Sequence, residues 1–189
     1  KVISGKIKYL TETTIDDLKN LKKTPASSKK TTNYNGKQKL SFMSTEINSG
    51  NIMLYAQYYD KDGVPGDYTA LEFNESGNLV ANYMRNKAIK SKSKIGILHT
   101  IMENQYSAFW MAYEIDDSKG VNSISPVVTK IDTKTKTISE PLVLGMVGKK
   151  RTYFVDNKFP MLNISDTQQV YFGSDKKGKN IWFCRVNLK

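Results

Sequence analysis

Residues 40–59 read LSFMSTEINSGNIMLYAQYY and contain two strand patterns joined by a turn at Ser49-Gly50. The first pattern is apolar around Phe42, and the second, residues 51–59, is rich in tyrosine. Aromatic side chains favour strands, and glycine supplies the positive φ angle that tight turns need. This stretch therefore predicts two strands that follow one another across a short turn.

The same layout occurs twice more along the chain. Residues 97–111 place an apolar strand pattern before the aromatic run 105–111, and residues 159–174 place one before the run 168–174. The aromatic runs begin near residues 51, 105 and 168, which is close to or somewhat above the length of a four-stranded propeller blade. We expect these aromatic strands to be central, with these side chains mostly buried: Leu54, Phe109, Met111, Val170 and Phe172.

Beyond Leu40, nearly all of the sequence has the pattern of short strands separated by turns. Turn chemistry is explicit at Asp62-Gly63 and at Glu75-Ser76-Gly77, where glycine can adopt a positive φ angle. The expected strands are residues 2–10, 39–47, 51–59, 68–73, 78–84, 95–102, 106–115, 127–131, 137–143, 152–155, 161–164, 169–173 and 180–188. Strands this numerous predict a single all-β domain over residues 1–189.

A short helix of about ten residues is expected near the N-terminus. Thr13 or Thr14 can cap it, and Ile15, Leu18 and Leu21 recur on one face. Residues 24–39, which follow it, are rich in Ser, Thr, Asn and Lys and predict a flexible basic loop.

The C-terminal 30 residues contain a further motif. Phe159-Pro160 precedes an inner strand, residues 164–166 form a turn, and residues 170–175 and 178–182 complete the pattern. This segment resembles a blade of the TolB-type, WD40-like β-propeller repeat, although Ser165-Asp166-Thr167 stands where that family usually has Pro-Asp-Gly. The resemblance implies a small or partial propeller-like arrangement of antiparallel sheets and contact with a protein or a glycan. A two-sheet β-sandwich is the alternative fold.

Few residues have the patterns of catalysis. His99 is the only histidine and Cys184 the only cysteine, which excludes two-histidine and cysteine-cluster metal sites. Both are expected to be ordinary strand residues. Paired carboxylates could still hydrolyse a glycan without histidine, so a carboxylate-dependent, glycan-acting enzyme is one alternative function. The candidate carboxylates are Glu72, Glu103, Glu114, Asp116 and Asp117.

The net charge is +11, from 29 basic and 18 acidic residues. Only three of the bases are Arg, the residue that dedicated phosphate and base readers favour. A polyanion- or nucleic-acid-binding protein is therefore a second alternative, and non-specific attraction to polyanions is expected. No apolar stretch is long enough to span a membrane. The chain starts at Lys1 without methionine, which fits either a signal peptide that has been removed or a boundary chosen within a longer sequence. With a binding or structural role, we expect a secreted or cell-envelope location.

Residues 59–68 are the best candidate for a ligand site. Tyr59 and Tyr68 flank an oxygen-rich loop containing Asp60, Asp62 and Asp67, and Tyr34 lies in the basic loop. Aromatic rings next to strands can stack on a sugar or grip a partner, and the carboxylates can orient a polar ligand or, at residues 60–67, a calcium ion. The sequence therefore predicts a non-enzymatic binding or structural module that contacts protein or glycan through these six residues, with no required cofactor.

Overall fold

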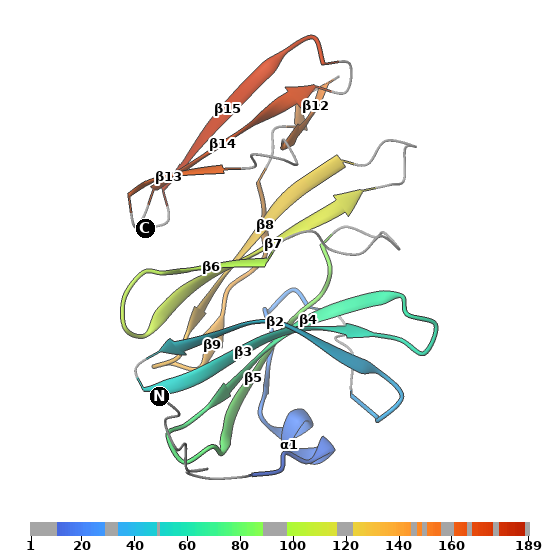
Figure 1. Ribbon diagram of the computed structural model, residues 1–189, viewed down its shortest axis with the longest axis vertical. Helices are drawn as coiled ribbons and strands as arrows, with labels where there is room; N and C mark the ends of the chain where they lie inside the picture. Colours follow the sequence, from blue (N-terminus) through green and yellow to red (C-terminus); the bar gives the residue numbers. More distant parts are fainter. Residues whose placement is uncertain are drawn as a thin grey trace, which may run out of the picture.

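The computed structural model describes residues 11–28, 34–48, 50–88, 98–116, 123–144, 147–148, 151–155, 161–165, 168–175 and 178–187. Within these ranges the chain forms one short helix and fifteen strands arranged in three sheets (Figure 1). The all-β prediction is therefore confirmed, and the described sheets number three rather than the two of a sandwich. The strand expected over residues 2–10 and the middle of the basic loop, residues 29–33, lie outside the described residues.

The helix α1 (Ile15–Asn20) is shorter than expected. Thr14 caps it: the Thr14 hydroxyl accepts a hydrogen bond from the Asp17 backbone N–H, and the Asp17 carboxylate accepts one from the Thr14 N–H. This reciprocal pair is a capping box. Leu21 ends the helix, and the following lysines form a two-residue strand, β1 (Lys22–Lys23), instead of a last helical turn.

The first sheet contains residues from the N-terminal half of the chain. Its strand order is β1-β5-β4-β3-β2, antiparallel except for the parallel pair β1 and β5. Gly50, Gly63 and Gly77 have positive φ angles at its three hairpin turns, as the turn chemistry predicted. Its other strands are β2 (Lys39–Asn48), β3 (Asn51–Tyr59), β4 (Pro65–Phe73) and β5 (Leu79–Arg85).

The second sheet has the order β10-β8-β7-β6, with β9 pairing β8. Residues 137–143, expected as one strand, form two short strands separated by a break that contains Pro141, which has no N–H to donate to a ladder. The strands are β6 (Leu98–Met102), β7 (Ser107–Asp116), β8 (Ser123–Asp132), β9 (Thr137–Ile138) and β10 (Leu142–Val143).

The third sheet has β14 at its centre, with β15 on one side and both β12 and β13 on the other. Each predicted repeat unit thus forms an antiparallel hairpin in a sheet of its own: β2–β3, β6–β7 and β13–β14. The strands of the third sheet are β11 (Val147–Gly148), β12 (Arg151–Val155), β13 (Met161–Ser165), β14 (Gln168–Asp175) and β15 (Ile181–Asn187).

The three sheets are stacked face to face, with the first and third at opposite ends of the molecule (Figure 1). Trp110 of the second sheet packs against Tyr55 and Tyr68 of the first. On the other face of the second sheet, Phe109 and Met111 share a core with residues of the third. The second sheet is therefore buried on both sides, and β7 is buried continuously from residue 107 to residue 114.

The expected core is partly wrong. Phe109 and Met111 are buried as predicted, but Leu54, Val170 and Phe172 are only half buried. On β3 and β14 the faces that carry Tyr55 and Tyr171 turn toward the second sheet, so these two residues are buried there. Adjacent residues of a strand point to opposite faces, so their apolar neighbours lie on the outer sides.

Candidate functional site

Asp60 shapes the turn between β3 and β4. Its Oδ1 atom accepts hydrogen bonds from the backbone N–H groups of Asp62 (2.9 Å) and Val64 (2.8 Å). The Asp60 N–H in turn donates to the Val64 carbonyl at 3.0 Å. Gly63 has a φ angle of 76°, which closes the turn in a conformation that other residues rarely adopt. One carboxylate oxygen of Asp60 is thus committed to the turn, and the turn holds Asp60 and Asp62 beside the end of β3.

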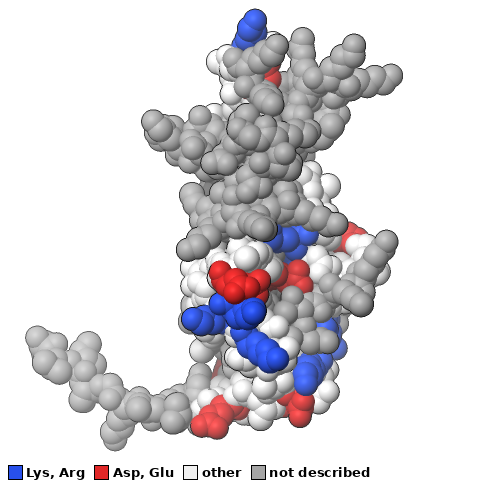
Figure 2. Space-filling view, turned by 90° about the vertical axis from the view of Figure 1, so that its right-hand side faces the viewer, with Lys and Arg blue, Asp and Glu red and all other residues white. Residues whose placement is uncertain are grey.

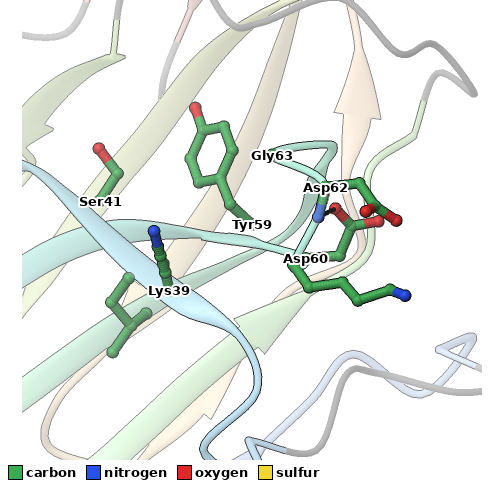
Figure 3. Close-up of a pocket in the computed structure, with 8 residues that line it drawn as sticks. Lys39, Ser41, Tyr59, Asp60, Asp62 and Gly63 are labelled. Carbon is green, nitrogen blue, oxygen red and sulfur yellow. Dashed lines mark hydrogen bonds between the residues drawn. The ribbon is translucent and has the colours of Figure 1, made fainter.

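A pocket of about 690 Å³ opens at this turn. Figure 3 shows the Tyr59 ring between Ser41 on one side and the carboxylates of Asp60 and Asp62 on the other. Tyr59 pairs with Lys39 across the β2–β3 ladder, which brings the start of β2 to the pocket. The lining residues are Lys39, Leu40, Ser41, Tyr59, Asp60, Lys61, Asp62 and Gly63.

The electrostatics of this pocket are balanced. Its lining carries two ammonium groups, from Lys39 and Lys61, and two carboxylates, from Asp60 and Asp62. Tyr59 is half buried while the four charged side chains are exposed, and burial raises the pKa of the Tyr59 phenol. Tyr59 is therefore a neutral phenol at pH 7, with a hydroxyl that can both donate and accept a hydrogen bond.

The other predicted site residues lie elsewhere. Tyr68 is fully buried between the first and second sheets, with the Arg85 guanidinium 4.1 Å from its ring centroid. The Asp67 carboxylate accepts a hydrogen bond from the Asn86 side chain at 3.1 Å. The Tyr34 ring contacts Tyr58, with 6.0 Å between the ring centroids. The structure brings together Tyr59, Asp60 and Asp62 but not these three.

The placement of Asp67 bears on the expected calcium loop. Among the described residues there is no group of three or more His, Cys, Asp or Glu side chains arranged to hold a metal ion. A calcium ion at residues 60–67 thus stays a prediction.

Two of the candidate catalytic carboxylates are buried at the contact between the first and second sheets. The Glu114 carboxylate lies 2.8 Å from Arg85 Nη1, and both side chains are fully buried. Glu72 accepts hydrogen bonds from Tyr83 Oη (2.7 Å) and Lys136 Nζ (2.6 Å). Each carboxylate is thus paired with a positively charged side chain inside the protein, and neither lines the pocket.

The remaining carboxylates add no acid–base pair to the described structure. Glu103 lies 2.5 Å from the ammonium group of Lys130. The Asp116 side chain and Asp117 lie outside the described residues, and so does the side chain of His99. Cys184 is a free, half-buried thiol beside the core between the second and third sheets.

Charge on the described surface is mixed. Figure 2 shows one face of the molecule, on which basic and acidic side chains alternate over the lower half. Three further Lys-rich stretches of the sequence, at residues 89–94, 149–150 and 176–177, lie outside the described residues. No helix in the described part of the chain is long and apolar enough to cross a membrane.

Sequence reasoning missed Lys39 and Ser41, which lie about twenty residues before Tyr59. They reach the pocket through an irregularity in the β2–β3 ladder between Phe42 and Ser44, which shifts the pairing by one residue. Without this bulge, Leu40 rather than Lys39 would stand opposite Tyr59. A bulge of this kind has no reliable sequence signal.

Comparisons with known proteins give no relative: no family model, curated protein or solved structure matches the chain.

Proposed function

We propose that this protein is a non-catalytic binding module that holds a neutral, hydroxyl-rich glycan in the pocket between β2 and the β3–β4 turn. The observation that carries the proposal is the half-buried Tyr59 ring in a pocket of about 690 Å³. A planar ring fixed on a sheet can stack on the apolar face of a sugar at little cost in conformational entropy.

The polar groups around Tyr59 suit hydroxyl recognition. The Asp60 and Asp62 carboxylates accept hydrogen bonds, the Lys39 ammonium donates them, and the Ser41 hydroxyl does both. Because two positive and two negative charges line the pocket, a neutral ligand is favoured there over a polyanion. Attraction of polyanions to other parts of this basic chain would be weak and salt-dependent.

The proposal extends to architecture and location. The face-to-face packing of three sheets, each containing one repeat hairpin, supports a propeller-like relationship between the sheets. A secreted or cell-envelope location is part of the proposal because surface glycans are presented there.

Isothermal titration calorimetry against defined hexasaccharides tests this function. The probes are β-1,4-linked hexamers of glucose, N-acetylglucosamine and xylose, with heparin as a polyanion. We expect saturable binding of at least one neutral hexamer. Tyr59→Ala should weaken it at least tenfold, which corresponds to about 1.4 kcal/mol, while Tyr59→Phe should retain most of the affinity because it keeps the ring.

Tyr106→Ala is the matched control, because it removes another tyrosine ring that solvent can reach, at the β6–β7 turn of the second sheet. It should bind the hexamer like the wild type. Failure of all three neutral hexamers to bind, or equal binding by wild type and Tyr59→Ala, would overturn the proposal.

A further inference from the structure

The outer face of the third sheet is apolar and exposed. Four side chains on β13 and β15 remain largely in water: Leu162 (61% exposed), Ile164 (51%), Ile181 (85%) and Phe183 (78%). Val170 and Phe172 of β14, between these strands, are half buried. Scattered single apolar residues are normal on a protein surface, whereas a contiguous group marks an interaction site.

The strand register places these side chains on one face, except Ile164, which lies at an irregularity of the β13–β14 ladder and has no residue opposite it. Val170 stands opposite Leu162, and Phe172 stands opposite Phe183. Directly opposed residues of antiparallel strands point to the same side of a sheet. The alternate residues Tyr171 and Trp182 point to the other side, where they pack on the second sheet.

The two ends of the stack differ. At the first sheet, α1 and Tyr34 cover part of the outer face, on which Phe42 stays 57% exposed. Asn82 Nδ2 donates to the Leu18 carbonyl at 2.7 Å, and Tyr34 contacts Tyr58. At the third sheet, the exposed fractions above show that the outer face is not covered. Terminal units of stacked repeats usually carry a polar outer face, so an apolar outer face is suited to contact with a partner.

We propose that this face packs against the same face of a second copy of the chain, related by a two-fold axis. Leu162, Ile181 and Phe183 are each more than 60% exposed on this face, and the largest apolar patch of a typical monomer measures roughly 300–600 Å². Two patches at the upper end of that range would bury about 1,200 Å² together, which reaches the lower end of the range for stable interfaces. Because both copies use the same patch, the assembly closes as a dimer.

Charge favours this surface for self-association. The chain carries a net charge of +11, so two copies repel each other over most approaches. Of the described side chains on this face only Arg185 is charged, and its guanidinium donates to Gln168 Oε1.

The proposed contact also repeats one already present within the chain, where the second and third sheets pack through apolar and aromatic residues. It is independent of the glycan pocket, which lies on the first sheet.

Sedimentation velocity from low to high micromolar concentration tests the proposal. The wild type should sediment increasingly as a species of twice 21.4 kDa as its concentration rises. Phe183→Lys should weaken dimerisation at least tenfold and leave the circular dichroism spectrum unchanged, because the Phe183 side chain is exposed. Ile181→Lys is the second variant and should do the same if Phe183→Lys fails to fold.

Leu142→Lys is the control, since it adds the same charge at a side chain that is 60% exposed on β10 of the second sheet. It should dimerise like the wild type. A wild type that remains monomeric throughout, folded face variants that dimerise normally, or a control that dissociates as much as Phe183→Lys would each overturn the proposal.

Discussion

At the scale of single residues, the contact between the first two sheets depends on buried charges. The Arg85 guanidinium lies over the rings of Tyr68 and Trp110, 4.1 Å and 5.4 Å from their centroids, and pairs with Glu114. Burying a charge is costly unless it is paired, so Arg85 and Glu114 depend on each other. The pair fixes how the inner face of β5 meets β7.

Removing one partner of this pair should be strongly destabilising. We expect Arg85→Ala to lower the free energy of unfolding by about 3–5 kcal/mol, because it leaves the Glu114 carboxylate buried beside a vacated site. Urea unfolding followed by circular dichroism measures this change. Lys19→Ala is the control, because it breaks an ion pair at the surface. The Lys19 side chain is 46% exposed and its partner Asp16 is 82% exposed, so the loss should cost no more than about 0.5 kcal/mol. Equal costs for the two variants would show that Arg85 is not buried as described.

Buried tyrosines should set the response to alkaline pH. Burial raises the pKa of Tyr58 and of Tyr113 to about 12, whereas the phenol of an unfolded chain has a pKa of about 10. Below pH 10 both states keep the phenolic proton, and between pH 10 and 12 only the unfolded state releases it. Stability should therefore fall in this window by about 1.4 kcal/mol per pH unit for each tyrosine.

Urea unfolding from pH 8 to 11.5 measures this slope. The double variant Tyr58→Phe, Tyr113→Phe should show a shallower decline than the wild type, because it lacks two of the titrating phenols. An identical decline in both proteins would contradict the burial of these two side chains.

At the scale of elements, the sequence was informative about where strands and turns lie and less so about which way they face. Glycine turns and aromatic runs predicted β3 to the residue and most other strands to within a few residues. Strand facing could not be predicted on β3 and β14, because large apolar or aromatic side chains stand on both faces of these strands, as with Leu54 beside Tyr55 and Val170 beside Tyr171. The pocket was predicted only where its residues are neighbours in the sequence, at Tyr59, Asp60 and Asp62, since Lys39 and Ser41 depend on a bulge.

The facing of β3 can be tested with two adjacent residues. Met53 is fully buried against the second sheet, while Leu54 points to the opposite side and is half buried. Met53→Ala should cost about 2–5 kcal/mol in the free energy of unfolding, and Leu54→Ala should cost clearly less. A larger cost for Leu54→Ala, measured by urea unfolding, would mean that β3 faces the other way.

At the scale of the whole molecule, the three sheets form a stack with unlike surfaces. One end is partly covered by α1, the other presents the apolar face of the third sheet, and the polar pocket opens beside the β3–β4 turn of the first sheet. The proposed glycan and the proposed second copy therefore occupy different sheets. Tyr59→Ala should therefore weaken glycan binding without affecting dimerisation, and Phe183→Lys should do the reverse.

The most direct test of the account is a two-dimensional ¹H–¹⁵N spectrum of the labelled protein, recorded while the tightest-binding neutral hexasaccharide is added. The account predicts that the amide signals of residues 39–41 and 59–63 shift and saturate together, because these residues line the pocket. Signals of β13–β15 should stay in place. The largest shifts falling on the third sheet, or no shifts around Tyr59 at a saturating concentration of the sugar, would contradict the account.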